Sequence, residues 1–182
     1  MNENNFITCE CVSDARQSVL NQVEQTYTDS FPEAERRDFS LVRQLIQESS
    51  FFKLFLFRSG EQYAGFLTTW DFGSFVYAEH FAISSEQRNG GIGSRALRSY
   101  LQSLTKPLVL EVELPADEWS RRRIGFYERL GFTLDSHRYV QPPYRPGGEE
   151  LEMRLMSYGS IELSASFDSV CRTIHRNVYG VE

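Results

Sequence analysis

Three glycines stand close together at Gly90, Gly91 and Gly93, in the stretch Arg88-Asn89-Gly90-Gly91-Ile92-Gly93. A strand-like run ends near Ile83, and the apolar pattern of a helix begins within this stretch. Glycines let backbone N–H groups approach an anion, and a helix N-terminus adds partial positive charge. Each such interaction contributes about 0.3–1 kcal/mol, so several must act together to hold a diphosphate. The stretch therefore predicts a phosphate-binding loop, with a glycine-rich turn that binds nothing as the alternative.

The same residues also match a dinucleotide-binding fingerprint. The segment Gly91–Ala96 fits G-x-G-x-x-A, and Glu111 lies near the distance expected for a ribose-binding acid. That fingerprint requires its first glycine directly after a strand, whereas seven polar or glycine residues, 84–90, follow Ile83 here. An NAD(P)-binding oxidoreductase is therefore the weaker interpretation.

The first half of the chain reads as a strand, two helices and an antiparallel meander. Val19, Leu20, Val23 and Tyr27 follow helical spacing, and Ser40 can cap a second helix. The buried stripe expected for this second helix is Leu41, Val42, Leu45 and Ile46. The expected strands are Phe6–Ser13, Phe52–Phe57, Tyr63–Asp71 and Ser74–Ile83, with turn signals at Ser59-Gly60 and Phe72-Gly73.

After Ile83 the pattern changes to helix and strand in alternation. A helix from Ile92 to Leu104 and the apolar strand Leu108–Leu114 imply a parallel crossover. We therefore expect an α/β (α+β) fold with a mixed, mostly antiparallel central sheet flanked by helices. The remaining expected elements are a helix over Ser120–Leu130 with Gly131 as its stop, strands Phe132–Leu134 and Leu151–Met156, and a tail helix with Phe167, Val170, Cys171, Ile174 and Val178 on one face.

Two segments together resemble the GNAT acyltransferases. Arg88–Gly93 is similar to the family's R/Q-x-x-G-x-G/A loop, and Phe126–Phe132 is similar to its F-Y-E-x-L-G-F segment. The order of expected elements fits that family's fold from about Phe6 to Ser157. The resemblance implies an acyltransferase that moves an acetyl group from acetyl-CoA to a primary amine of a small molecule or peptide, by direct attack in a ternary complex.

The resemblance also implies roles for particular residues. The loop would hold the pyrophosphate of coenzyme A, and backbone amides at the end of the preceding strand would bind the pantetheine arm and polarise the thioester carbonyl. One departure is that Ser120 and Arg123 stand where many members have Asn and Ala. The predicted cofactor-binding residues are Phe81, Ala82, Ile83, Arg88, Asn89, Gly90, Gly91, Ile92, Gly93, Ser94 and Ser120.

Acetyl transfer to an amine needs a proton acceptor and a proton donor. Glu79, on the strand before the glycine loop, is the first candidate for the base, with a structural ion pair as the alternative role. Glu111 and Glu113 on the next strand are further candidates. The resemblance equates Tyr127 with the tyrosine that protonates the leaving thiolate, against the alternative of a core aromatic.

Chain length and net charge restrict the number of domains and the kinds of partner that we expect. A chain of 182 residues suits one domain, which we expect over residues 1–158 with a helical extension at 159–182. The net charge of −6 argues against a nucleic-acid partner. We expect no signal segment, no membrane span and no metal, and three free thiols in a reducing cytoplasm.

The acceptor amine stays open at this stage, and so does the role of the tail helix. That helix can cover the sheet, close the acceptor site or join two copies in a homodimer. A CoA-binding regulator without catalysis is the rival from another class, and Tyr127 argues against it because a regulator needs no proton donor.

Overall fold

The computed structural model describes residues 6–88 and 90–181. The chain divides into two compact units. Unit 1 comprises Met1–Thr69 and Glu79–Leu104, and unit 2 comprises Trp70–Ala78 and Thr105–Glu182. The division falls within the strands β3 (Gln62–Asp71) and β4 (Val76–Ile83), so each of these strands contributes residues to both units.

The sheet of unit 1 is the expected meander. Strand β1 (Ile7–Cys11) pairs antiparallel with β2 (Phe52–Ser59), with Ile7 opposite Ser59. Strands β3 and β4 follow β2 in chain order. Gly60 makes the turn after β2 with φ 61°, a conformation that glycine adopts readily.

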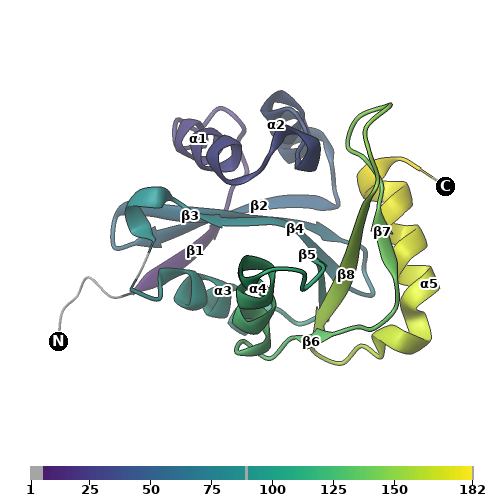
Figure 1. The fold of residues 1–182 in the computed structure, drawn as a ribbon. Coiled ribbons are helices and arrows are strands. Elements are labelled where there is room, and N and C mark those ends of the chain that lie inside the picture. The colour runs from purple at the N-terminus through teal and green to yellow at the C-terminus, as the bar shows by residue number, and fades with distance from the viewer. Residues whose placement is uncertain (1–5, 89, 182) are drawn as a thin grey trace. The chain divides into compact units, whose positions relative to one another are not determined.

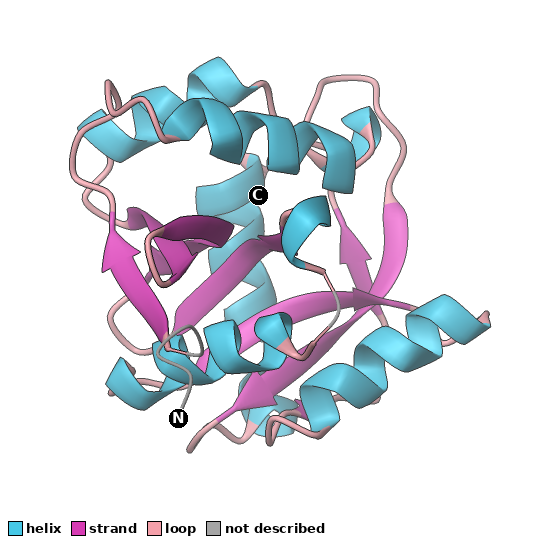
Figure 2. Ribbon diagram, turned by 90° about the vertical axis from the view of Figure 1, so that its left-hand side faces the viewer, coloured by secondary structure: helices cyan, strands magenta, loops and turns pink. Residues whose placement is uncertain are grey.

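Three α-helices cover this sheet on both faces. Helices α1 (Leu20–Ser30) and α2 (Phe39–Glu48) lie on one face and α3 (Ile92–Ser103) on the other, as Figure 1 and the turned view in Figure 2 both show. The short 3₁₀ turns η2 (Glu33–Glu35) and η3 (Ser85–Gln87) join these elements to their neighbours. The core under α1 is aromatic, since the Tyr27 ring lies 5.6 Å from Phe39, 5.9 Å from Phe66 and 4.9 Å from His80.

The expected stripe of α2 was wrong at Leu41, which is 47% exposed. The helix begins at Phe39 with Asp38 as its N-cap, rather than at a Ser40 cap. Phe39 and Val42 take the buried positions. The sequence pattern missed this start because Phe39 stands among charged loop residues, outside the apolar periodicity.

Unit 2 holds the parallel pair that the sequence predicted. The first residues of β4 pair parallel with β5 (Leu108–Glu113), with Val76 opposite Leu108. Strand β8 (Leu151–Tyr158) pairs antiparallel with β5 and also with two short strands, β6 (Thr133–Leu134) and β7 (Tyr139–Gln141). The fold class, a mixed and mostly antiparallel sheet flanked by helices, is confirmed.

The helices of unit 2 include one that follows β8. Helix α4 (Glu118–Glu128) contacts β5 and β6, and α5 (Leu163–Ile174) runs along β7 and β8 (Figure 1). Helix α5 continues into a π-helical turn, η4 (His175–Tyr179). The expected tail helix is therefore present, but it ends in a turn that the sequence pattern did not predict.

The predicted start of α4 at Ser120 was wrong by two residues. Asp117 is the N-cap, and Ser120 stands at the third helical position, where the two residues form a reciprocal capping box. The predicted stop at Gly131 is confirmed, with φ 93°. Strand β7 was not predicted because it has only three residues and is followed directly by the proline- and glycine-rich segment 142–148.

Strands β3 and β4 approach very closely at Gly65. A Cβ atom on Gly65 would lie 2.3 Å from the carbonyl oxygen of Ala82 and 2.9 Å from Cδ1 of Ile83. Because a backbone carbonyl cannot rotate away as a side chain does, only glycine fits here. Gly65 thus determines where the last residues of β4 lie, and these residues lead into the glycine loop.

We expect Gly65→Ala to lower the free energy of unfolding by about 1–3 kcal/mol, the usual effect of overpacking. Urea unfolding would measure this loss, provided that the slope of the free energy of unfolding against urea concentration is the same in the variant and the wild type. Gly125→Ala is the matched control, because its new Cβ would meet only the flexible end of Arg129 at 3.2 Å. That control should be neutral or gain up to about 1 kcal/mol from helix propensity. Equal stability of the two variants would contradict the steric argument.

Candidate active site

The glycine loop, residues 88–93, leaves β4 through η3 and enters α3 at Ile92. Gly90 has φ 71° and Gly91 has φ 73°, both in the left-handed region that favours glycine. A Cβ atom on either residue would meet nothing within 4 Å. The backbone of the loop is therefore open on the side where those side chains would stand. Asn89, a predicted cofactor ligand, lies outside the described residues.

The N-terminus of α3 presents backbone N–H groups that have no acceptor within the helix. Gly91 is the N-cap, and among the described residues no side chain caps this end and no acid stands in its first turn. The first bond of the helix runs from the Arg95 N–H to the Gly91 carbonyl oxygen at 3.2 Å. The N–H groups of Ile92, Gly93 and Ser94 precede that bond and have no acceptor within the helix. Open glycines followed by uncapped amides fit a phosphate group.

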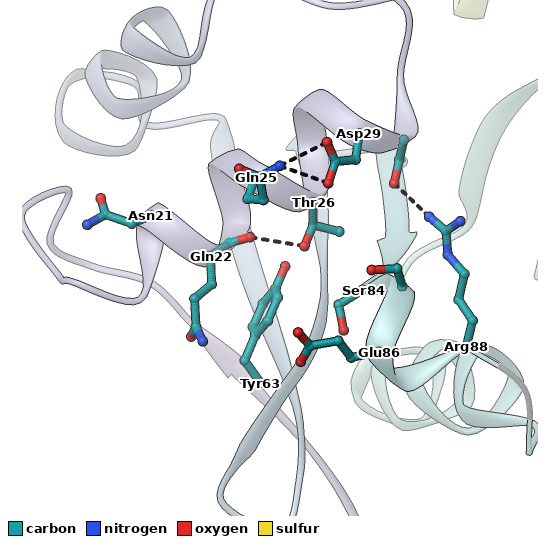
Figure 3. Close-up of a pocket in the computed structure, with 11 residues that line it drawn as sticks. Asn21, Gln22, Gln25, Thr26, Asp29, Tyr63, Ser84, Glu86 and Arg88 are labelled. Atoms are coloured by element: carbon teal, nitrogen blue, oxygen red, sulfur yellow. Dashed lines mark hydrogen bonds between the residues drawn. The ribbon is translucent and has the colours of Figure 1, made fainter.

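The Arg88 side chain ties this loop to α1. Its Nε donates to the carbonyl oxygen of Ile83 at 3.1 Å, and Nη2 donates to Ser30 Oγ at 3.1 Å. Figure 3 shows the guanidinium reaching the end of α1 across a cavity of about 350 Å³. Through these two bonds the side chain of Arg88 holds the glycine loop in position against α1.

The last residues of β4 are held firmly by unit 1. The Phe81 ring packs 5.9 Å from Phe57, and Ala82 is buried beside Gly65. The Ser84 N–H donates to the carbonyl oxygen of Ala64 at 2.9 Å. Phe81, Ala82 and Ile83 therefore form a rigid approach to the glycine loop.

Glu79 is bound to an arginine. Its Oε1 accepts a hydrogen bond from Nη2 of Arg37, which follows η2, and its Oε2 lies 3.8 Å from His80 Nδ1. The Arg37 and Glu79 side chains are 13% and 1% exposed. These contacts support the structural ion pair, the alternative that the sequence left open for Glu79.

Tyr127 is buried in α4, with its ring 5.4 Å from Phe132. Burial raises the pKa of Tyr127 to about 12, and the nearby Arg123 opposes this rise in part. The hydroxyl is therefore protonated at neutral pH. On the same helix, Ser120 is buried and its hydroxyl bonds to Asp117 Oδ1 at 3.0 Å, within the capping box.

Comparison with known proteins decides the family. The model of the acetyltransferase (GNAT) family matches residues 18–132. A protein from Bacteroides thetaiotaomicron assigned to the same family superposes with a TM-score of 0.92 at 35% identity, covering 96% of this chain and 99% of that one. The chain belongs to the GNAT acetyltransferase family.

Two further relatives are more distant. YjbC of Bacillus subtilis, also assigned as an acetyltransferase, is 28% identical over 108 residues. That match covers 58% of this chain and spans about half, 53%, of the length of YjbC. Arabidopsis thaliana Naa50, solved with the bisubstrate analogue CoA-Ac-MVNAL, has a TM-score of 0.59 at 20% identity and covers 84% of this chain and 98% of its own, which shows the shared fold.

One polar cluster of this GNAT chain was missed by the sequence argument. It surrounds Glu111 on β5, which accepts hydrogen bonds from the hydroxyls of Tyr139 and Tyr179. Gln141 Nε2 donates to the Tyr179 hydroxyl oxygen at 2.8 Å. Tyr139 and Gln141 belong to the unpredicted strand β7, and Tyr179 belongs to the unpredicted turn η4. The available signal was the acid Glu111 within the apolar strand Leu108–Leu114.

The other predicted acid on β5 is more exposed. Glu113 Oε2 accepts from Arg123 Nη1 at 2.8 Å, with the two side chains 44% and 53% exposed. Across residues 6–88 and 90–181, no group of three or more His, Cys, Asp or Glu side chains is arranged to hold a metal ion. Within those same ranges no helix is long and apolar enough to cross a bilayer.

The three cysteines are free thiols with raised pKa values. Burial raises the pKa of Cys9 on β1 and of Cys171 in α5 to about 12. Burial also raises the pKa of Cys11, which Lys53 lowers in part. Cys9 and Cys171 are therefore protonated at neutral pH and react slowly as nucleophiles.

We expect Arg37→Met to lower the free energy of unfolding by about 3–5 kcal/mol, because the carboxylate of Glu79 stays buried without its guanidinium partner. The double variant Arg37→Met/Glu79→Gln should recover part of that loss, since the buried charge is then gone. Urea unfolding of the three variants measures both effects.

The control for this prediction is Arg16→Met. Arg16 pairs with Asp14 at the surface, with side chains 85% and 41% exposed, so its loss should change stability little. Similar losses at Arg37 and Arg16 would show that the buried pair has no special role.

Proposed function

We propose that this chain is an acetyl-CoA-dependent N-acetyltransferase that acts on a primary amine of a small molecule or peptide. The amine would attack the thioester directly while both substrates are bound. The observation that carries the proposal is the glycine loop, in which the open backbone at Gly90 and Gly91 leads into the uncapped N-terminus of α3. Membership in the GNAT family supports the same chemistry.

In this proposal the glycine loop binds the pyrophosphate of acetyl-CoA, which supplies the activated acetyl group as a thioester. The donors are the backbone N–H groups of Gly90, Gly91, Ile92, Gly93 and Ser94. Arg88 keeps the loop in position from the side of α1. Contacts of Asn89 and Ser120 with the cofactor stay predictions, since Asn89 is not described and the Ser120 hydroxyl serves the capping box.

The backbone at the end of β4 has a separate task. Amides of Phe81, Ala82 and Ile83 would bind the pantetheine arm and polarise the thioester carbonyl. Donors that are already fixed before the reaction stabilise a developing oxyanion without reorganising. The close approach at Gly65 supports this role, because it holds these residues rigidly.

Tyr127 would protonate the departing thiolate. A phenol whose pKa is raised to about 12 keeps its proton at neutral pH but is a weaker acid than a free phenol. Burial acts on thiols in the same direction, as it raises the pKa of Cys9 to about 12. Burial thus raises the proton affinity of a phenol and of a thiolate alike, so a buried phenol can still donate to a buried thiolate.

Three acids are candidates for the proton acceptor on the amine side. Glu79 is the residue predicted first, and its ion pair with Arg37 supports a bracing role more directly. Glu113 is paired with Arg123 near the surface. Glu111 accepts hydrogen bonds from the phenols of Tyr139 and Tyr179.

Acetyl-CoA should raise the melting temperature in proportion to the logarithm of its concentration over Kd, whereas NAD and NADP should not. A shift with NAD(P) and none with acetyl-CoA would overturn the proposed function.

Gly91→Asp should weaken binding of CoA at least tenfold, because it brings a negative charge to the phosphate site. Isothermal titration with CoA measures the loss.

The matched control is Gly91→Asn, which has nearly the same shape as Gly91→Asp but no charge. Asn and Asp both tolerate the left-handed backbone better than other residues with a Cβ. Gly91→Asn should therefore bind CoA more tightly than Gly91→Asp. Equal affinities of the two variants would mean that the loop does not approach the phosphates.

Tyr127→Phe should lower kcat by about 10²–10⁴, the range for losing a positioned general acid, while CoA affinity changes little. Steady-state release of CoA from acetyl-CoA measures the effect. The control is Tyr158→Phe, whose ring also packs on Phe132, at 5.4 Å. If Tyr127→Phe turns over at the wild-type rate, another group protonates the thiolate.

A further inference from the structure

The cavity that Arg88 crosses is lined almost wholly by polar side chains. It measures about 350 Å³ and lies between α1, the beginning of β3 and the segment that follows β4, all within unit 1 (Figure 3). Of the eleven described residues that line it, three carry carboxamides, five carry hydroxyls and three are charged. No aliphatic side chain belongs to this set. The cavity therefore suits a hydrophilic ligand and is unsuited to an acyl chain.

Two acids line the cavity from different elements. Asp29 stands in the last turn of α1, where both of its oxygens accept from Gln25 Nε2 at 2.9 Å. Glu86 stands in η3. Within the described residues, neither acid forms an ion pair with a Lys, Arg or His side chain. The C-terminal end of a helix carries partial negative charge, and the last turn of α1 holds no basic residue, so a cation beside Asp29 would be stabilised twice.

One guanidinium lines the same cavity. Arg88 donates to the carbonyl oxygen of Ile83 and to Ser30 Oγ, which are both neutral acceptors. Across residues 6–88 and 90–181, Arg88 forms no ion pair with an acid. A guanidinium bonds more strongly to a carboxylate, which can accept two parallel N–H groups. A ligand that carries a carboxylate would therefore find a better partner in Arg88 than Ser30 is.

The charges of the lining define the charges of the ligand. Two carboxylates and one guanidinium line the cavity, and they form no ion pair with one another in the described part of the chain. A further cation, Arg43, bonds to Asn21 Oδ1 in the lining at 3.0 Å, but it is paired with Glu24 at 3.3 Å and so adds no net charge. The complement of this lining is a molecule with two ammonium groups and one carboxylate. That set of groups is the one carried by a diamino acid.

We propose that this cavity binds a basic α-amino acid of the lysine type, and that the bound amino acid tightens the grip of the glycine loop on CoA. The carboxylate of the ligand bonds to the guanidinium of Arg88. One ammonium group lies against Asp29 and the other against Glu86, which stand on different walls of the cavity (Figure 3). The methylene stem packs on the ring of Tyr63, since the stems of charged chains cover apolar surface while their ends stay polar.

Arg88 connects the cavity to CoA binding, because it is the first residue of the glycine loop and its side chain reaches α1. The ligand would add ionic contacts that join α1, η3 and Arg88 together. A loop that is already held loses less conformational freedom when CoA binds, so the two ligands should bind with positive cooperativity. The coupling rests on the proposed CoA site, whereas the amino-acid site stands without it.

The first test titrates the wild-type chain by calorimetry, without acetyl-CoA, with four probes that share a linear carbon skeleton. L-Lysine carries all three charged groups, cadaverine lacks the carboxylate, L-norleucine lacks the side-chain ammonium and ε-aminocaproate lacks the α-ammonium. L-Lysine should bind with a Kd below about 1 mM, and each other probe about tenfold more weakly. Absence of saturable lysine binding, or equal affinities of the four probes, would overturn the proposal.

The second test assigns each contact with variants that remove one charge. Asp29→Asn and Glu86→Gln should each weaken L-lysine about tenfold. Arg88→Gln should weaken L-lysine by a similar factor without weakening cadaverine, because cadaverine has no carboxylate. Circular dichroism checks that each variant is folded. If Arg88→Gln weakens both probes equally, the carboxylate does not bind at Arg88 and the proposal is wrong.

The matched control is Glu48→Gln. Glu48 ends α2 and accepts from Gln44 Nε2 at 2.7 Å, as Asp29 does from Gln25, but it lies outside this cavity. The control should bind L-lysine as the wild type does. Equal losses in Glu48→Gln and Glu86→Gln would show a general effect of net charge and would overturn the site.

The third test measures the coupling. Saturating L-lysine should lower the Kd of CoA about fivefold, and CoA should lower the Kd of L-lysine by the same factor, because linkage is reciprocal. Asp29→Asn should abolish this effect. A CoA affinity that L-lysine leaves unchanged or weakens would overturn the coupling. If L-lysine binds and CoA does not, the proposed function fails and the amino-acid site stands; if CoA binds and L-lysine does not, the site fails and the proposed function stands.

Discussion

A buried negative charge on β4 organises unit 1. The side chain of Glu79 is 1% exposed, and a carboxylate so deeply buried is stable only with a partner and further hydrogen bonds. Arg37 supplies that partner from a position 42 residues earlier in the chain. The backbone N–H of Arg37 donates in turn to the Tyr27 hydroxyl at 3.1 Å. The segment between α1 and α2 is therefore held by the charge and by the aromatic core together.

The neighbouring residue on β4 extends this arrangement. The Nε2 atom of His80 lies 3.0 Å from the carbonyl oxygen of Glu35, and its ring contacts Phe31 at 4.6 Å. In unit 2, Glu111 on β5 accepts hydrogen bonds from the phenols of Tyr139 and Tyr179. In both units an acid on a strand gathers partners from distant parts of the chain.

The parts that the sequence predicted well depend on local pattern. Alternating and helical periodicities located most strands and helices, and the positive φ values of Gly60 and Gly131 matched turn and stop signals. The glycine loop could be found from the sequence because glycine is the residue that readily adopts the positive φ values of Gly90 and Gly91. The errors at Leu41 and Ser120 have different causes. Phe39 anchors the start of α2 through a tertiary contact, since its ring lies 5.6 Å from that of Tyr27. Asp117 caps α4 through a local bond with Ser120, which apolar periodicity does not reveal.

The cluster around Glu111 could not be predicted in this way. An ideal helix that buries Val178 on the face of Ile174 turns the next residue away by about 100°. The π-helical turn changes that register, so Tyr179 reaches Glu111 although the pattern of the tail gives no sign of it. Strand β7, which supplies Tyr139 and Gln141, has only three residues and is therefore too short to show an alternating pattern in the sequence. Pairings over 28 and 68 positions leave no periodic trace.

The raised pKa values of the cysteines have a practical consequence at the bench. A thiol whose pKa is about 12, as for Cys9 and Cys171, is present as thiolate at only about one part in 10⁴ at pH 8. The thiol of free coenzyme A, with an ordinary pKa near 8.5, is about one quarter ionised under the same conditions. Chromogenic disulfide reagents react with thiolates, so they would report liberated cofactor against a slow background from these two side chains. The burial of Cys9 and Cys171 thus keeps their share of the background small, and the exposed Cys11 is the thiol whose reaction a blank without acceptor has to subtract.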